Sequence, residues 1–136
     1  MKVLEHVAVV ADDPESLADW YCRVLGFELL SKGTVVLGDT EIDYHFLGLS
    51  GGALLEILNS NGKPRTRKED DDAGIRHIAF LVEDMDASCR ALQEKGVEIG
   101  ALRELPNGTK LAFFRDPEDN ILQLVYRTAP VRPWLA

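Results

Sequence analysis

The sequence predicts an α+β fold made of two copies of one strand–helix–strand–strand–strand unit. The stretch "LEHVAVVADDPESLADWYCRVLGFEL" near the start is followed later by a similar stretch, "IRHIAFLVEDMDASCRALQEKGVEI". Each begins with a histidine in a short apolar run, passes an acidic turn and a helix-like segment, and ends in Gly-hydrophobic-Glu-hydrophobic. The pairs His6–His77 and Asp13–Asp84 are both separated by 71 positions. This constant spacing indicates an internal duplication, so both halves are expected to have the same order of elements.

The first unit is expected to start with a strand and to continue into an amphipathic helix. Residues 3–10 are rich in valine and alternate between two faces, which is typical of a strand. Asp12 or Asp13 can then cap a helix that has Pro14 in its first turn and ends at Gly26. Five large side chains recur at helical spacing and are expected to form the buried stripe of this helix: Leu17, Trp20, Tyr21, Val24 and Leu25.

Strand-like runs fill the rest of the first unit. Their sequences are "FELLSK", "GTVVLG", "EIDYHFLGL" and "GALLEILN", and the last of them ends at residue 59. Glycines mark the expected turns between these runs, at Gly33, at Gly38 with Asp39, and at Gly51 with Gly52. The first module is therefore predicted to cover residues 3–59.

The second half is expected to repeat this plan after a surface connection. Residues 60–74 are polar and charged and include Gly and Pro, so they are predicted to connect the two modules over the surface. The second module, residues 75–127, contains the strand "IRHIAFLV", the helix "EDMDASCRALQEKG" and strand-like pieces in "VEIG", "LRELPNG", "TKLAFFRDP" and "NILQLVYR". The tail, residues 128–136, has two prolines and no regular pattern. Its Trp134 and Leu135 are expected to dock on the domain surface or on a second subunit.

Length and composition are those of one globular domain. The chain has 136 residues, of which 46% are hydrophobic and 28% charged. Its net charge of −8 argues against nucleic-acid binding, which needs a basic face. No apolar run is long enough to span a membrane, and the start lacks the apolar segment of a signal peptide. Cys22 and Cys89 lie in helix-like segments and are expected to be reduced, packed thiols, which favours a cytoplasmic protein.

Polar residues at matching positions of the two halves are the main functional signal. Glu56 lies in the apolar run "LLEIL", and Gln123 lies 67 positions later in the similar run "ILQLV". A carboxylate buried without a partner in such a strand would destabilise the fold. A pseudo-twofold relation between the modules would bring Glu56 and Gln123 together with His6 and His77. Two imidazoles, a carboxylate and an amide oxygen suit a divalent ion such as Mn, Fe, Co, Ni or Zn.

Simpler roles for these residues stay open on the sequence alone. A strand histidine is more often a hydrogen-bonded core or surface group than a metal ligand. Glu56 could also pair with Arg76 or Arg115. His45 has no counterpart in the second half, so it is expected to face solvent or to line the wall of a pocket.

Several segments resemble the vicinal oxygen chelate superfamily, which includes glyoxalase I, methylmalonyl-CoA epimerase, extradiol dioxygenases, and fosfomycin and bleomycin resistance proteins. The similarity lies in "HVAVVADDPESLADWYCRVLGFEL", "LLEIL", "IRHIAFLVEDMDA" and "FFRDPEDNILQLV", and it extends over residues 3–127. It implies a single domain of two βαβββ modules that form a cupped, mixed eight-stranded sheet with the helices on its outer face. It also implies a homodimer and a divalent metal ion on the concave face, held by His6, Glu56, His77 and Gln123.

The function that this resemblance implies is that of a metal-dependent lyase or isomerase of the glyoxalase type. Such an enzyme, similar to lactoylglutathione lyase or to a thioester epimerase, would act on a small oxygenated substrate with Glu56 as its catalytic base. Glyoxalase I usually has Glu where this chain has Gln123, and an amide can bind a metal but cannot accept a proton. Two alternatives stay open, namely a metal-free protein that sequesters an antibiotic and a small dioxygenase. The acidic charge favours a cationic drug in the first case, and aromatic side chains could stack on it: Trp20, Tyr44, Phe46, Phe113 and Phe114.

Overall fold

The computed structural model describes residues 3–131, and these residues divide after Thr66 into two compact units. Each unit has the order strand, helix, strand, strand, strand, and each forms its own four-stranded mixed sheet. The predicted α+β fold of two βαβββ modules is therefore confirmed. None of the helices in residues 3–131 combines the length and the apolar character needed to cross a membrane.

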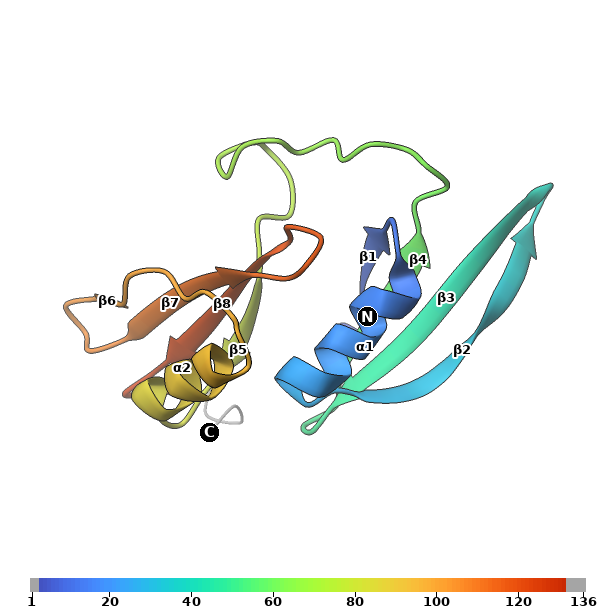
Figure 1. Ribbon diagram of the computed structural model, residues 1–136. Helices are drawn as coiled ribbons and strands as arrows, with labels where there is room; N and C mark the ends of the chain where they lie inside the picture. The colour runs from blue at the N-terminus through green and yellow to red at the C-terminus, as the bar shows by residue number, and fades with distance from the viewer. Residues whose placement is uncertain (1–2, 132–136) are drawn as a thin grey trace. The chain divides into compact units, whose positions relative to one another are not determined.

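The first unit consists of one helix on a sheet with the strand order β1-β4-β3-β2 (Figure 1). Its elements are β1 (Val7–Ala11), α1 (Pro14–Leu25), β2 (Glu28–Leu37), β3 (Thr40–Leu49) and β4 (Ala53–Asn59). β1 runs parallel to β4, whereas β2, β3 and β4 are connected as antiparallel neighbours. Because β1 begins at Val7, the predicted strand over residues 3–10 starts later than expected, and His6 lies just before it.

Helix α1 is fixed by its ends and by its buried face. Asp13, one of the two predicted caps, accepts a hydrogen bond of 3.0 Å from the backbone N–H of Ser16. Gly26 ends the helix in the left-handed conformation with φ 75°, which glycine adopts without strain. Four helix side chains are buried against β3 and β4: Leu17, Ala18, Tyr21 and Val24. Trp20 and Leu25, predicted for the same stripe, are only partly buried, because they lie at its edges.

Strand β2 corrects the prediction of two short strands with a turn at Gly33. The chain remains extended through Gly33, which pairs with Tyr44 across the β2–β3 hairpin. A Cβ atom at Gly33 would lie 3.0 Å from the hydroxyl oxygen of Tyr44, so glycine here makes room for an aromatic ring. The irregularity in the strand lies between Leu29 and Ser31, where the register shifts as in a β-bulge. The turns predicted at Gly38 and at Gly51 with Gly52 are confirmed.

The second unit repeats the plan with shorter outer strands. Its elements are β5 (Ile78–Leu81), α2 (Met85–Glu94), β6 (Arg103–Glu104), β7 (Lys110–Arg115) and β8 (Ile121–Tyr126), in the sheet order β5-β8-β7-β6. Asp84 caps α2 by accepting a 2.9 Å hydrogen bond from the backbone N–H of Ala87, as Asp13 does for α1. The strand predicted in "VEIG" is wrong, because residues 97–100 have no ladder partner and pass directly from the helix toward β6.

The "DPEDN" segment between β7 and β8 is a loop held by hydrogen bonds to the side chain of Asp116. Asp116 is almost fully buried and its carboxylate accepts hydrogen bonds from the backbone N–H groups of Glu118 and Asn120. It also accepts a 2.8 Å bond from the side-chain amide of Asn120. Asp119 adopts a positive φ of 69°, which a short polar side chain tolerates at the tip of such a turn.

Three further expectations concern single residues. His45 is buried on the face of the first sheet that α1 covers, so the prediction of a solvent-side or pocket-wall histidine is wrong. Cys22 and Cys89 are free, partly buried thiols in the two helices, as expected. Trp134 and Leu135, predicted to dock on a surface, lie outside the described residues.

Candidate metal centre

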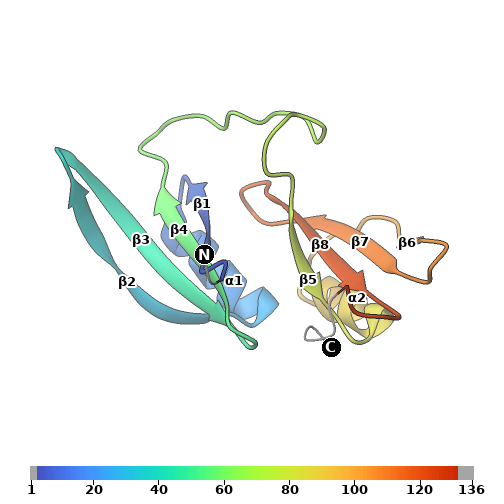
Figure 2. The same cartoon turned by 180° about the vertical axis from the view of Figure 1, so that it is seen from behind.

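The first unit carries a group of four side chains that we call the first half-site: Glu5, His6, Phe46 and Glu56. Glu56 lies in the middle of β4, between Ala8 on β1 and Phe46 on β3. Because side chains alternate along a strand, Glu56 points away from the buried face that α1 covers. Figure 2 shows this uncovered face of the sheet, with α1 behind it.

The histidine and the carboxylate of the first half-site approach each other directly. His6 Nε2 lies 3.3 Å from Glu56 Oε2, and the Glu56 side chain is only 18% exposed. On the other side of the ring, His6 Nδ1 donates a hydrogen bond to the carboxylate of Glu5. The ring also packs edge-on against Phe46, with 5.4 Å between the ring centroids. In metal-binding histidines, the ring nitrogen that does not bind the metal usually donates a hydrogen bond to a carboxylate or carbonyl oxygen. Glu5 has this position at His6 Nδ1, and Nε2 is the nitrogen that faces Glu56.

These contacts change the proton affinity of His6. The hydrogen bond to Glu5 raises the pKa of His6 above its ordinary value, while desolvation opposes this effect. The negative charges of Glu5 and Glu56 raise the pKa further. In the absence of another cation, protonated His6 is therefore stabilised between two carboxylates.

The second unit has the same arrangement at the matching positions, and we call it the second half-site: Arg76, His77, Phe113 and Gln123. Gln123 lies in the middle of β8, between Ala79 on β5 and Phe113 on β7. His77 packs edge-on against Phe113 with 5.5 Å between ring centroids, as His6 does against its phenylalanine. Gln123 is only 8% exposed.

Arg76 takes the place that Glu5 has in the first half-site. Its guanidinium carbon lies 5.1 Å from the centroid of the Phe113 ring, and its Nη1 lies 3.3 Å from His77 Nδ1. Arginine has only donors, so His77 Nδ1 is the acceptor in this contact. Burial lowers the pKa of His77, and the positive charge of Arg76 lowers it further. His77 is thus held in the neutral form that a metal ligand requires.

In the first unit His6 and Glu56 contact each other. In the second unit His77 packs on Phe113, and Gln123 lies next to the same phenylalanine across the sheet. Each unit by itself supplies two of the four predicted ligands. Within residues 3–131, no three side chains of the His, Cys, Asp and Glu types converge on one point as a metal cluster. The types of donor atom fit a divalent ion, because two imidazole nitrogens, one carboxylate and one amide oxygen form a mixed N/O set.

The sequence did not single out Glu5, and it indicated Arg76 only as a possible partner for Glu56. Phe46 and Phe113 were predicted only as aromatic residues that could stack on a ligand in the metal-free alternative. Phe46 and Phe113 are separated by 67 positions, the same spacing as Glu56 and Gln123, so the repeat contained this signal. Glu5 and Arg76 share the spacing of 71 with the two histidines, but they differ in charge. Their importance becomes visible only through their contacts with the histidine rings.

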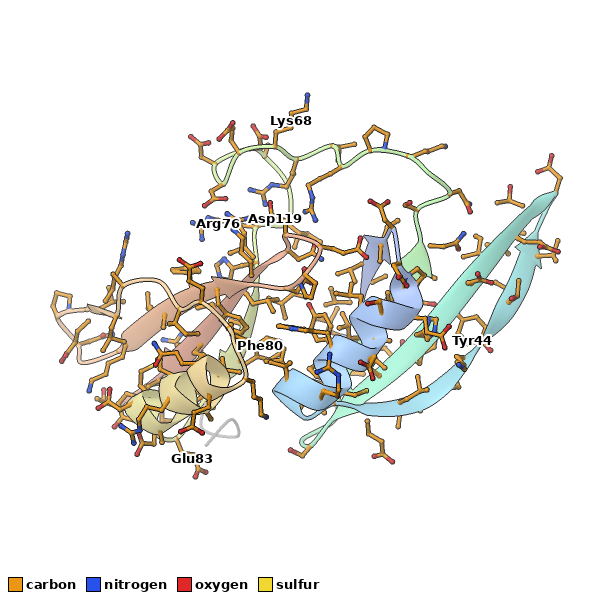
Figure 3. All side chains as sticks on the ribbon, viewed as in Figure 1. Tyr44, Lys68, Arg76, Phe80, Glu83 and Asp119 are labelled. Atoms are coloured by element: carbon orange, nitrogen blue, oxygen red, sulfur yellow. The ribbon has the colours of Figure 1, made fainter. Side chains whose placement is uncertain are left out.

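The structure also locates the possible salt-bridge partner of Glu56 and the aromatic residues that the sequence offered for ligand stacking. Arg115 pairs with Asp70 at 2.6 Å and with Asp119 at 3.3 Å, and Glu56 instead approaches His6. Of the aromatic residues proposed to stack on a ligand, Phe114 is buried in the core of its unit and Trp20 belongs to α1. Tyr44, Phe46 and Phe113 are partly exposed; Tyr44 is labelled on β3 in Figure 3.

Each unit of the duplicated βαβββ architecture has a histidine just before its first strand and an oxygen donor on its last strand. A family model described as the Glyoxalase/Bleomycin resistance protein/Dioxygenase superfamily matches residues 3–124. The chain therefore belongs to this superfamily, in agreement with the resemblance seen in its sequence.

Individual proteins agree with this assignment. The uncharacterized protein YwkD of Bacillus subtilis is 30% identical over 126 residues, which cover 91% of this chain and 96% of YwkD. A probable lactoylglutathione lyase of Synechocystis is also 30% identical, over 90% of this chain and 93% of its own. The crystal structure of a glyoxalase family protein from Enterococcus faecalis matches with a TM-score of 0.79 and 32% identity, covering 91% and 97% of the two chains.

Proposed function

We propose that this protein is a metal-dependent lyase or isomerase of the glyoxalase type that acts on a small oxygenated substrate. The observation that carries the proposal is the contact of 3.3 Å between His6 Nε2 and Glu56 Oε2, together with the matching pair of His77 and Gln123. The similarity to a probable lactoylglutathione lyase supports the same class of reaction.

In this proposal His6, Glu56, His77 and Gln123 together hold one divalent ion, either within a chain or between two chains of a homodimer. The ion would supply Lewis-acid stabilisation of negative charge on two neighbouring substrate oxygens. Phe46 and Phe113 flank the ligands and limit the access of water to them. The hydrogen bond between Glu5 and His6 orients the imidazole, so that its Nε2 lone pair is directed toward the ion.

Glu56 is the group that can move a proton in this site. Its carboxylate would take the proton from the carbon beside the substrate carbonyl and return it to the neighbouring carbon or to the opposite face. Gln123 binds through its amide oxygen and does not exchange protons. The chain thus has one carboxylate base, where an enzyme with Glu at both positions has two.

The proposal can be tested by separating metal binding from proton transfer at position 56. Purified, untagged protein is loaded in turn with Ni, Co, Zn, Mn and Fe and assayed on hemithioacetals and acyl-thioesters. Conversion to thioester and exchange of the α-proton for deuterium are both followed. The variant Glu56→Gln retains an oxygen donor but has no base, and we expect turnover and exchange to fall by about 10² or more. Glu41→Gln, which removes an exposed carboxylate of β3, is the matched control and should retain activity.

Two results would contradict the proposal. One is the absence of metal-dependent turnover and of proton exchange with every metal and both substrate classes. The other is equal activity of Glu56→Gln and the unchanged protein. Oxygen consumption by the iron-loaded protein, without proton exchange, would instead favour the dioxygenase alternative.

A further inference from the structure

Arg76 is the one cation of the second half-site, where it contacts Phe113 and His77 and has no salt bridge to a carboxylate of the described part of its unit. Its guanidinium lies over the face of Phe113 at 5.1 Å from the ring centroid, and its Nη1 contacts His77 Nδ1 at 3.3 Å. The aromatic face fixes the plane of the guanidinium and stabilises its charge. No carboxylate pairs with Arg76 within the described part of its unit.

Three other cations of the described residues pair with carboxylates, whereas Arg76 does not. The protein contains 23 acidic and 15 basic residues, so carboxylates are in excess. Other cations use them: Arg23 pairs with Asp19, Lys32 with Glu15, and Arg115 with Asp70 and Asp119. Arg76 has instead an aromatic ring and an imidazole as its neighbours.

A carboxylate at the same end of the unit as Arg76 already has a cationic partner. Figure 3 labels Arg76 where the chain enters β5, and Asp119 in the loop that precedes β8. These two segments lie at the same end of the sheet, because β5 and β8 run parallel. Asp119 pairs with Arg115 at 3.3 Å.

We propose that Arg76 is a specificity-determining residue that binds an oxyanion of the substrate, a carboxylate or a phosphate group, beside the candidate metal centre. The guanidinium has five N–H donors, and His77 occupies one of them. The others form a fork that matches two oxygens of a carboxylate or phosphate. That the oxyanion belongs to the substrate rests on the proposed function, whereas the anion site itself rests on the contacts of Arg76.

The experiment uses the full chain freed of metal with EDTA, so that an anion cannot bind through a metal ion. Inorganic phosphate and malonate are titrated separately at constant ionic strength, and the NMR signals of His77 and Phe113 are followed. The variants Arg76→Gln and Arg76→Lys are compared with Arg90→Gln. Arg90 is an exposed residue of α2, so its replacement removes the same charge from the same unit.

We expect saturable shifts at His77 and Phe113 with at least one of the two anions. The affinity should fall by about fivefold or more in Arg76→Gln, be partly retained in Arg76→Lys and be unchanged in Arg90→Gln. The tighter of the two probes tells whether the site prefers a phosphate or a carboxylate. Equal affinity of Arg76→Gln and the unchanged protein, or no shift at Phe113 up to about 50 mM of either anion, would overturn the proposal. Because no metal is present, this result is independent of whether the chain binds a metal.

Discussion

His6 Nε2 and Glu56 Oε2 are 3.3 Å apart, although the two residues are 50 positions apart in the sequence. The parallel pairing of β1 with β4 creates this contact, because it sets Ala8 beside Glu56 and thus His6 one step along the same face. In the second unit the pairing of Ala79 with Gln123 is the same. One register, used twice, therefore produces both halves of the candidate metal centre.

The pKa values of the two histidines are predicted to shift in opposite directions from the ordinary histidine value. The hydrogen bond to Glu5 raises the pKa of His6, and burial with the charge of Arg76 lowers that of His77. As the pH falls, His6 should thus gain its proton first. NMR titration of the metal-free protein measures both values.

Two variants isolate the causes of these shifts. Glu5→Gln removes the charged acceptor and should lower the pKa of His6 without changing His77. Arg76→Gln should raise the pKa of His77 toward its ordinary value but not fully, because the burial of His77, which also lowers the pKa, is unchanged. A His6 pKa below that of His77 in the unchanged protein would contradict the described contacts.

Removing either helix cap should destabilise the protein by a similar amount. Asp13 and Asp84 each accept one backbone N–H bond at the start of a helix, and such a cap contributes about 1 kcal/mol. Asp13→Ala and Asp84→Ala are therefore expected to lower the free energy of unfolding in urea by about 1 kcal/mol each. Asp86→Ala, which removes a charge from the first turn of α2 but leaves the Asp84 cap in place, should have a smaller effect. An equal loss in all three variants would mean that charge rather than capping is responsible.

The buried carboxylate of Asp116 should be much more important for stability than the neighbouring exposed one. Asp116→Ala leaves two backbone N–H groups and the Asn120 amide without their acceptor, at a cost of about 3 kcal/mol. Asp119→Asn keeps a residue that tolerates the positive φ and loses only an exposed ion pair, so it should cost less than about 1 kcal/mol. Equal urea midpoints for the two variants would refute this account of the loop.

Replacing His45 with an apolar residue should stabilise the first unit. His45 is 7% exposed, and both of its ring nitrogens lack a hydrogen-bond partner within the described residues. It pairs across the sheet with Ile57, which is fully buried. His45→Leu removes two unsatisfied polar atoms and should raise the free energy of unfolding by about 1 kcal/mol. A loss of stability of similar size, measured in urea, would indicate that the imidazole has a favourable interaction in solution.

The repeat made much of this architecture predictable from the sequence. Matching spacings predicted the two modules and the four candidate ligands, and the acidic turn predicted Asp12 or Asp13 as the cap of the first helix. Alternation along β4 correctly separated Glu56 from its buried neighbours, because side chains of a strand point to opposite faces by geometry alone.

Features that depend on contacts across the sheet could not be predicted in this way. Gly33 has the sequence signal of a turn, but it is required because the Tyr44 ring lies against it in the hairpin. The alternation of β3 placed His45 on the face of Leu47 without showing that α1 covers that face. Arg76 was considered only as a partner for Glu56, since the sequence does not reveal its position on Phe113.

The central claim is that His6, Glu56, His77 and Gln123 bind a divalent metal ion. Calorimetric titration of the EDTA-treated protein with Co, Ni, Zn and Mn tests it most directly, with elemental analysis of the loaded protein. His6→Ala and His77→Ala are compared with His45→Leu, which changes the third histidine but neither half-site. We predict about one ion per ligand set, lost in both alanine variants and retained in His45→Leu. No binding of any of the four metals, or equal binding in His77→Ala and the unchanged protein, would contradict the account.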